Sequence, residues 1–374
     1  MPKIFILAGD PSGDIHSARL MKALLEINPD IEFIGIGGQF MTAAGLESIL
    51  PIAEVSVVGF WEVAKKYFFF KNLQNKCKDI IINQQIDLFL PVDYPGFNIP
   101  LADFAKKNNV PVAYYIAPQL WAWGKNRAKK LADSVDKLLV AFPFEEDFFR
   151  KYGIDTQFVG HPLLDSNDFD ERILTFSERD NLIAIMPGSR EQEIIRHIPL
   201  MQEVVGRILE QKPDYKIGIG VSPSIPREFY ENFLKNKIEC ELFENSRLLM
   251  NKAKAGIIKT GTSNLEAVMC GMPFNMFYRT SGLTYYLGSK LVNLEFISLA
   301  NILAGKEIVK EFIQSTATPK AIADDILNLV SDELRFKNIQ NEFVSVCSKL
   351  GTKGASARSA KIILDLIEQR KNHD

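Results

Sequence analysis

The sequence predicts an α/β protein made of two doubly wound domains, each a parallel β-sheet wrapped by helices. Its 374 residues, 47% of them hydrophobic, exceed one ordinary domain and suffice for two cores. Short apolar runs alternate with amphipathic stretches along almost the whole chain, and strands that are apolar on both faces are typical of parallel sheets covered by helices. A polar, acid-rich stretch at residues 165–180 interrupts this alternation and is the expected linker.

Each half of the chain supplies its own set of strands. In the first half the expected strands are residues 3–8, 32–36, 88–92, 112–116, 137–140 and 157–159, with helices such as 14–27 and 99–107 between them. In the second half they are residues 182–186, 216–220, 241–243, 255–258 and 274–277. We therefore expect domains at 1–165 and 166–345, and a C-terminal helix within 346–374 that packs on the first domain or on a partner chain. Two such domains would face each other across a cleft, because ligands of these sheets bind outside the carboxyl ends of the strands.

Composition excludes several classes of function. A formal net charge of -2 gives no electrostatic case for nucleic acid as the main partner. The four cysteines contain no CxxC pair, which argues against a zinc site or a disulfide framework and favours a reducing cytosol; they are Cys77, Cys240, Cys270 and Cys347. No apolar run reaches the roughly 20 residues that span a membrane, so any membrane contact would be peripheral. No histidines share metal-ligand spacing, and Asp168 and Asp170 in the linker are interpreted as solvated acids, so we expect neither metal nor cofactor.

Two loops of the first domain are candidates for chemistry. The loop after the first strand is rich in glycine and opens a helix, a setting that favours an anion; its candidate residues are Ser12, Gly13, Asp14 and His16. A plain capped turn, with Ser12 or Asp10 as the cap, is equally compatible with this pattern. Asp93 follows a wholly apolar strand and is a candidate general base, since Asn98 can cap the next helix in its place.

Two turns of the second domain suit a diphosphate. The turn after the strand at 182–186 offers exposed amides and a guanidinium, from Gly188, Ser189 and Arg190. The turn after the strand at 255–258 offers small hydroxyl-bearing residues, namely Gly261, Thr262 and Ser263. Glu266, one turn into the next helix, is placed to accept the hydroxyls of a ribose. Neither turn has the Gly-Lys-Ser/Thr ending of a P-loop, so NTP hydrolysis is not expected.

Aromatic residues gather in two places. Trp121 and Trp123 lie beyond a strand and precede several cations, which suits sugar phosphates, although core packing is the better explanation of the tryptophans alone. A second group lies in residues 55–78 beside several lysines, and its members are Phe60, Trp61, Val63, Tyr67, Phe68, Phe69 and Phe70. Three consecutive phenylalanines cannot all point inward from one helix. We therefore expect this segment to contact acyl chains or a membrane surface, with core packing of an aromatic helix face as the alternative.

Taken together, these loops resemble one family, the lipid-A-disaccharide synthases, over nearly the whole chain. The matching motifs are Gly9-Asp-Pro-Ser-Gly-Asp-Ile-His16, Gly35-Ile-Gly-Gly38 with Met41, Val58-Gly-Phe-Trp-Glu-Val63, Asp93-Tyr-Pro-Gly-Phe-Asn98, Pro118-Gln-Leu-Trp-Ala-Trp123, Phe142-Pro-Phe-Glu145, Phe158-Val-Gly-His-Pro162, Pro187-Gly-Ser-Arg-Glu191, Lys259-Thr-Gly-Thr262 with Leu265-Glu266, Tyr278-Arg279 and Asn301-Ile-Leu-Ala-Gly305. The sequence departs mildly from the family at Asp10, where Glu is usual, at Thr260, where Ser is frequent, and at Ala300, where Pro is common.

The resemblance implies a GT-B fold and a defined reaction. UDP-2,3-diacylglucosamine would donate its sugar to 2,3-diacylglucosamine 1-phosphate, giving lipid A disaccharide 1-phosphate and UDP with inversion and without a metal. Asp93 matches the family's candidate base, and Arg190, Glu266 and Asn301 match positions associated with the donor nucleotide. The expected location is the cytoplasm, peripherally at the inner face of the inner membrane, and a homodimer is left open. The alternatives are a UDP-sugar 2-epimerase, which needs no acceptor, and a non-catalytic nucleotide-sugar or lipid-binding module.

Overall fold

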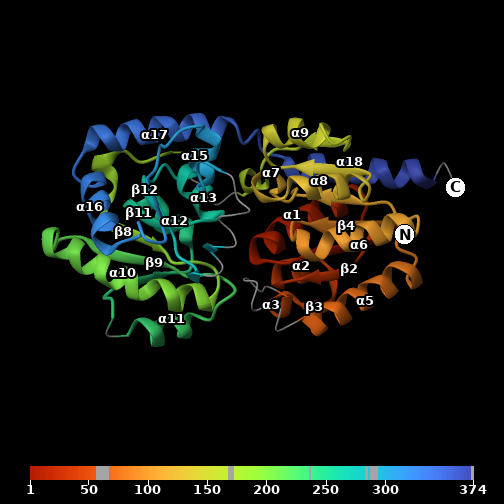
Figure 1. Ribbon diagram of the computed structural model, residues 1–374, viewed down its shortest axis with the longest axis horizontal. Coiled ribbons are helices and arrows are strands. Elements are labelled where there is room, and N and C mark those ends of the chain that lie inside the picture. The colour runs from red at the N-terminus through yellow and green to blue at the C-terminus, as the bar shows by residue number, and fades with distance from the viewer. Residues whose placement is uncertain (56–66, 167–171, 236, 283–284, 287–293, 372–374) are drawn as a thin grey trace. The chain divides into compact units, whose positions relative to one another are not determined.

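The chain folds into two compact units, each built on one parallel sheet (Figure 1). The computed structural model describes residues 1–55, 67–166, 172–235, 237–282, 285–286 and 294–371. The first unit contains Met1–Ser166 together with the C-terminal segment from Leu350. The second unit contains most of the chain between Asn167 and Lys349.

The first unit is a doubly wound sheet of seven strands in the order β3-β2-β1-β4-β5-β6-β7. The strands are β1 (Lys3–Ala8), β2 (Glu32–Gly37), β3 (Leu46–Pro51), β4 (Leu88–Val92), β5 (Ala113–Tyr115), β6 (Lys137–Val140) and β7 (Thr156–Phe158). The helices are α1 (Pro11–Ile27), α2 (Gln39–Ala43), α3 (Ile52–Val55), α5 (Tyr67–Asn83), α6 (Pro95–Lys107), α7 (Leu120–Trp123), α8 (Lys125–Ala132), α9 (Pro143–Arg150) and α18 (Ala355–Lys371), with a 3-10 turn η1 (Pro162–Asp165).

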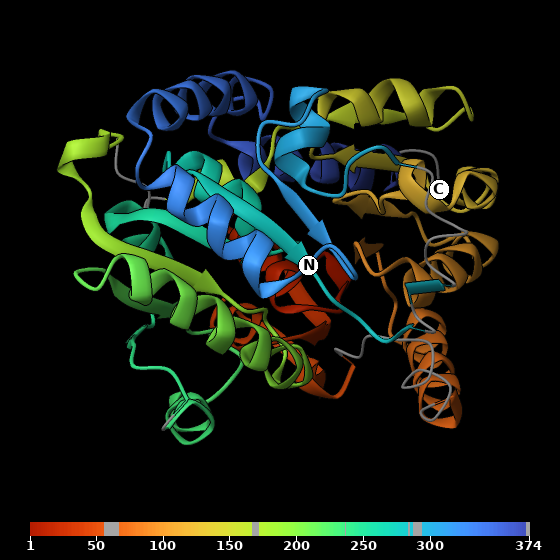
Figure 2. The same cartoon turned by 60° about the vertical axis from the view of Figure 1, so that its left-hand side comes forward.

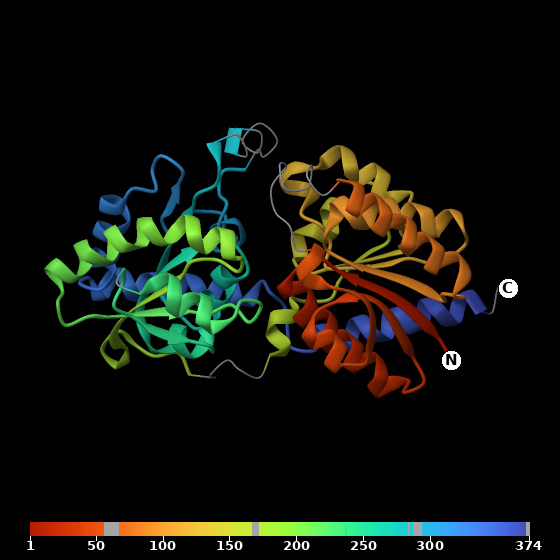
Figure 3. The same cartoon turned by 90° about the horizontal axis from the view of Figure 1, so that it is seen from below.

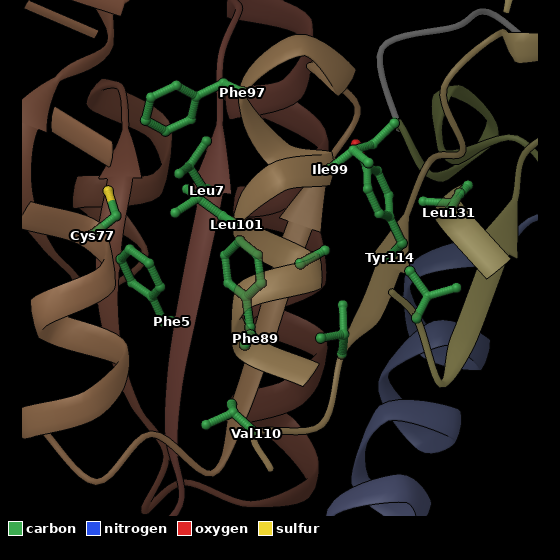
Figure 4. Close-up of a cluster of buried hydrophobic side chains, with 14 of the residues drawn as sticks. Phe5, Leu7, Cys77, Phe89, Phe97, Ile99, Leu101, Val110, Tyr114 and Leu131 are labelled. Carbon is green, nitrogen blue, oxygen red and sulfur yellow. The ribbon is translucent and has the colours of Figure 1, made fainter. Parts of the chain in front are cut away.

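Alternate residues of the central strands supply the two cores of this unit. Phe5 and Leu7 of β1 point to the face covered by α5, α6 and α8, where Phe5 stacks on Phe89 at 5.4 Å between ring centroids (Figure 4). Ile4 and Ile6 point to the other face, which α1 and α18 cover. Because successive side chains of a strand alternate, strands that are apolar at every position need helices on both faces.

The second unit is a parallel sheet of six strands in the order β10-β9-β8-β11-β12-β13. The strands are β8 (Asp180–Met186), β9 (Lys216–Gly220), β10 (Glu241–Phe243), β11 (Ala253–Lys259), β12 (Phe274–Tyr278) and β13 (Glu311–Ile313). The helices are α10 (Glu191–Gln211), α11 (Arg227–Leu234), α12 (Ser246–Lys252), α13 (Ser263–Met269), α15 (Leu299–Ala304), α16 (Pro319–Leu329) and α17 (Glu333–Ser348), with a 3-10 turn η2 (Phe176–Glu178). Helices α10 and α16 lie side by side (Figure 2).

The last helix, α18, belongs to the first unit, where it packs along α1 (Figure 3). Its first turn is held by Asp165, whose carboxylate accepts hydrogen bonds from the amides of Gly354, Ala355 and Ser356 at 2.7, 3.0 and 2.7 Å. A carboxylate in this position satisfies amides that have no partner within the helix and interacts favourably with its dipole. The C-terminal segment is therefore fastened to the end of the first domain of the sequence.

The predicted fold class, two doubly wound parallel sheets of the GT-B type, is confirmed. All eleven expected strands are present, with ends that coincide with the predicted ones or differ from them by at most two residues. Two edge strands, β3 and β13, were not predicted, because their residues are largely exposed or half-buried and lack an apolar pattern. Asp168 and Asp170 of the expected linker lie outside the described residues.

Candidate active site

In the first unit the loops after β1 and β4 leave the sheet next to each other. The sheet order makes these two strands neighbours, and Ala8 pairs with Val92 in their register. The order of the strands reverses at this point, where ligands of doubly wound sheets bind. The sheet therefore brings the loop that begins at Gly9 against Asp93.

The backbone around Asp93 adopts an uncommon conformation. Asp93 and Tyr94 have φ angles of 41° and 53°, and Ile116 at the neighbouring strand end has a φ of 57°. The amide of Asp93 donates to the carbonyl oxygens of Tyr115 and Ile116, each at 3.2 Å. Left-handed non-glycine residues cost about 1–3 kcal/mol each and cluster at functional sites.

Two buried side chains, Asn98 and Tyr114, hold the backbone of this strained turn through hydrogen bonds. The carbonyl oxygen of Asp93 accepts hydrogen bonds from Nδ2 of Asn98 at 2.7 Å and from the hydroxyl of Tyr114 at 2.5 Å. The prediction that Asn98 caps a helix near residue 99 is wrong, because α6 begins at Pro95 and Asn98 lies inside it. Asn98 instead ties the helix back to the strand end that carries Asp93.

The side chain of Asp93 has the electrostatics of a base that works near neutral pH. Burial raises the pKa of Asp93 to about 7, the charge of Asp10 adds to the rise, and the amide of Tyr94 opposes it. A general base is most effective when its pKa lies near the working pH. The half-buried Asp93 carboxylate is therefore suited to accept a proton from a hydroxyl group.

Glu145, a fully buried acid of the same unit, was not singled out as a site residue from the sequence. Its carboxylate accepts from the indole Nε1 of Trp121 at 2.9 Å and from the amide of Phe142 at 3.1 Å. Burial raises the pKa of Glu145 to about 8, and the charge of Asp93 contributes to the rise. Glu145 lies in the first turn of α9, after β6, and the motif Phe142-Pro-Phe-Glu145 was the available signal in the sequence.

The loop after β1 is largely occupied with structural contacts. Asp10 caps α1 by accepting from the amide of Gly13 at 2.7 Å. The buried Asp14 carboxylate accepts from the amides of Gly38, Phe40 and Met41 at 2.8, 3.2 and 3.0 Å, and so holds the start of α2. An anion contact by Ser12, Gly13, Asp14 and His16 stays a prediction, and Asp14 is already engaged with protein amides.

Gly9 and His16 show how closely this loop packs against its neighbours. A Cβ atom on Gly9 would lie 2.3 Å from the ring of Tyr94, so only glycine lets that ring lie over the loop. The ring of His16 meets that of His161 edge-on, with 6.0 Å between centroids. Burial lowers the pKa of His161 to about 4, and the charge of Asp165 opposes this, so the imidazole is neutral near pH 7.

In the second unit the two predicted turns also meet where the strand order reverses. Strands β8 and β11 are neighbours, with Met186 paired to Ile258, so the turns that follow them emerge together. The amide of Ser189 donates to Oε2 of Glu193 at 3.0 Å. The ammonium of Lys259 lies 2.9 Å from Oε1 of the same carboxylate, and Nη1 of Arg190 lies 3.4 Å from it.

Glu266 and Asn301, the remaining residues predicted to contact the donor nucleotide, have different surroundings. Glu266 forms an ion pair with Arg247 at 3.2 Å. Asn301 is buried; its Oδ1 accepts from the amides of Ile308 and Val309, while its Nδ2 donates to the carbonyl of Val309 and to Glu311. Asn301 therefore holds the chain before β13, and its predicted contact with the nucleotide stays a prediction.

The turn after β11 is open above Gly261. Gly261 has a φ of 146°, and a Cβ atom placed on it would meet nothing within 4 Å. Thr262 and Ser263 begin the short helix α13. The diphosphate contacts predicted for Gly188, Gly261, Thr262 and Ser263 remain predictions.

The aromatic segment divides into two parts where it is described. Tyr67 and Phe68 are 57% and 75% exposed at the start of α5, whereas Phe69 and Phe70 pack against the first core. Lipid contact can therefore involve the first pair directly, while the second pair anchors the helix. Phe60, Trp61 and Val63 lie outside the described residues.

The described part of the chain contains neither a membrane-spanning helix nor a cluster of metal-ligating side chains. No helix there has the length and apolarity needed to cross a bilayer. Nor do three or more His, Cys, Asp or Glu side chains come together there in a way that could hold a metal ion.

Comparison with known proteins supplies the family. The family model described as Lipid-A-disaccharide synthetase matches residues 4–365. A lipid-A-disaccharide synthase of Syntrophus aciditrophicus is 36% identical over 379 residues, with 98% of each chain covered. A second one, of Myxococcus xanthus, is 32% identical over 374 residues, with 98% of each chain covered.

Solved structures share the fold at much lower identity. The UDP-GlcNAc 2-epimerase of Neisseria meningitidis bound to UDP-GlcNAc superposes with a TM-score of 0.61 at 13% identity, covering 99% of this chain and 100% of that one. Likeness at this level concerns the fold alone, whereas the family match extends over almost the whole sequence. The chain therefore belongs to the lipid-A-disaccharide synthetase family and is a glycosyltransferase of lipid A biosynthesis.

Proposed function

We propose that the chain transfers 2,3-diacylglucosamine from its UDP conjugate to 2,3-diacylglucosamine 1-phosphate. The products are the β-1,6-linked lipid A disaccharide 1-phosphate and UDP. Family membership supports the reaction type. The observation that carries the mechanism is the Asp93 carboxylate, held on a strained turn at a strand end with a pKa near 7.

In this mechanism Asp93 acts as the general base. Its carboxylate takes the proton of the acceptor's 6-hydroxyl, and that oxygen attacks the anomeric carbon of the donor sugar. The bond from the anomeric carbon to the diphosphate oxygen breaks at the same time, and UDP leaves from the opposite face with its electron pair. A single displacement of this kind inverts the anomeric centre.

The second unit stabilises the leaving group. The diphosphate gains negative charge as the glycosidic bond breaks, so donors fixed around it accelerate the reaction more than they tighten ground-state binding. The guanidinium of Arg190 is the principal donor in this proposal, with amides of the turns at Gly188–Ser189 and Gly261–Ser263 around it. Glu266 accepts the ribose hydroxyls, for which it exchanges part of its ion pair with Arg247.

The acyl chains and the bilayer contact the first unit. Exposed Tyr67 and Phe68, with Phe60, Trp61 and Val63 before them in the sequence, form the proposed apolar contact. Peripheral binding at the inner face of the inner membrane gives the enzyme access to substrates whose acyl chains lie in the bilayer. No metal or other cofactor takes part in the proposed reaction, and a homodimer is compatible with it.

The test is an assay with the purified chain and both diacylated substrates, with UDP and lipid products measured separately. We expect UDP to appear only when acceptor is present, in a one-to-one ratio with disaccharide. A UDP-sugar 2-epimerase would instead convert the donor without acceptor, and a binding module would give no product. Either result would refute the proposal.

A further inference from the structure

A carboxylate lies at the centre of the predicted diphosphate site of the second unit. Glu193 stands in the first turn of α10 and receives donors from two different strand ends. From the turn after β8 come the amide of Ser189 at 3.0 Å and Nη1 of Arg190 at 3.4 Å. From the end of β11 comes the ammonium of Lys259 at 2.9 Å.

The backbone of the turn at Gly188 lies close against the carboxylate of Glu193. Gly188 has a φ of 131°, and a Cβ atom on it would lie 2.4 Å from Oε2 of Glu193. Burial acts to raise the pKa of Glu193, but Lys259, Arg190 and the Ser189 amide outweigh it and hold the pKa below its ordinary value. The position is therefore one that strongly favours a negative charge.

The same donors have capacity for more acceptor oxygens than Glu193 supplies. Among the described residues, Nε of Arg190 is buried and has no hydrogen-bond acceptor. A buried donor without an acceptor is rare in native proteins and points to a group that binds there. The side chains of Arg190, Lys259 and Glu193 are 25%, 17% and 15% exposed, so a ligand can reach them.

An amide, an ammonium and a guanidinium that converge on one point are the donors that proteins use for phosphate groups. A diphosphate brings more charge and more oxygens than a single carboxylate and satisfies these donors more completely. It cannot share them with an ionised Glu193, since like charges at such distances repel.

We propose that Lys259 is a phosphate-binding residue of the donor site and that Glu193 substitutes internally for the phosphate, being displaced when the diphosphate of a UDP-sugar binds. This inference rests on the proposed function. It adds a third cationic or amide donor to Arg190 and Ser189. It also gives Glu193 a part in the cycle, since its return to these donors assists the release of UDP.

The test measures binding of UDP and of uridine, which lacks phosphate, to the full chain by calorimetry and NMR titration. Lys259→Gln should weaken UDP binding by about tenfold or more, because a charge-assisted hydrogen bond to phosphate is lost. Glu193→Gln should tighten UDP binding about threefold or more, because a competing anion is removed. Uridine binding should be the same in all variants, and Lys259→Arg should retain most of the UDP affinity.

Matched controls are Lys216→Gln, at the amino end of the same sheet, and Glu203→Gln, on the exposed side of the same helix. Both should bind UDP like the wild type, and circular dichroism checks that every variant is folded. If folded Lys259→Gln binds UDP normally, or Glu193→Gln weakens UDP as Lys259→Gln does, the inference is refuted while the proposed function stands. A wild-type chain that does not bind UDP would refute the proposed function and the inference together.

Discussion

At the scale of single residues, the proposed chemistry depends on a pKa of Asp93 that is high enough for the carboxylate to act as a base. A carboxylate in water has a pKa near 4 and is a weak base at pH 7. Here burial is the main cause of the raised pKa, and the nearby charge of Asp10 is the second. The hydroxyl of Tyr114 donates to the backbone of the same turn. Burial and the charge of Asp93 raise the pKa of this hydroxyl, so the Tyr114 side chain stays neutral. Glu145 also interacts with Asp93, whose charge adds to the effect of burial in raising the pKa of Glu145.

Replacement of Asp10 by Asn tests this arrangement. The base must be deprotonated, so kcat/KM of the wild type should rise with pH through about 7. Asp10→Asn removes a negative charge near Asp93, which lowers the pKa of Asp93 and moves the rise to lower pH. Asparagine still caps α1, so the fold is retained.

The measurement is the pH dependence of kcat/KM. The exposed Asp30→Asn is the control and should leave the pH profile unchanged. An unchanged profile in Asp10→Asn would show that the two carboxylates do not interact.

At the scale of strands and helices, the sequence predicts the elements well where burial is complete. Strand β1 is apolar after Lys3 and β4 is apolar at every position, and both have the bounds that were predicted. Strand β3 was missed because Glu47 and Ser48 are exposed at the sheet edge, where no apolar pattern is required. Helix α6 was placed four residues late, since Pro95 and Gly96 suggest a turn although proline is well tolerated in the first turn of a helix.

Contacts between elements account for most of what the sequence did not predict at the site. Asp93 was proposed because it directly follows the apolar strand β4, and Arg190 because it lies in the turn after β8. The ion pair of Lys259 with Glu193 depends on β8 and β11 being neighbours in the sheet. The residues of either segment alone do not predict the order of the strands. The left-handed φ of Asp93 and Ile116, which follow the paired strands β4 and β5, likewise has no signal in the residue types.

Attachment of α18 to the first unit gives a prediction at this scale. Asp165→Ala removes the carboxylate that accepts three amides at the start of α18, and loss of such a cap costs about 1–2 kcal/mol. Amides of residues 354–371 should then exchange hydrogen faster, as measured by mass spectrometry. Asp332→Ala, which removes the cap of α17, should instead affect residues 333–348. Equal protection of α18 in wild type and Asp165→Ala would contradict this account of its attachment.

At the scale of the whole molecule, the two units divide the reaction between them. In the proposed mechanism the first unit carries the base and the exposed aromatic residues, and the second carries the donors for a diphosphate. The proposed base and the proposed diphosphate donors each follow a strand at which the strand order reverses, so one folding rule accounts for both halves of the proposed chemistry.

Binding to lipid should depend on the exposed pair at the start of α5. Replacement of Tyr67 and Phe68 by Ser should reduce sedimentation with anionic phospholipid vesicles several-fold without lowering the melting temperature, since both side chains are exposed. Leu334→Ser, which removes a 70% exposed apolar residue of the second unit, is the control and should not change sedimentation. Undiminished sedimentation of the double variant would exclude this pair from the lipid contact.

The most direct test of the central claim compares turnover with donor binding in Asp93→Asn. If Asp93 takes the proton from the acceptor, the variant should bind UDP as the wild type does and form disaccharide about 10²-fold more slowly or worse. Near-normal turnover would remove Asp93 from the chemistry, and an equal loss of UDP binding would mean that it supports the fold and not the reaction.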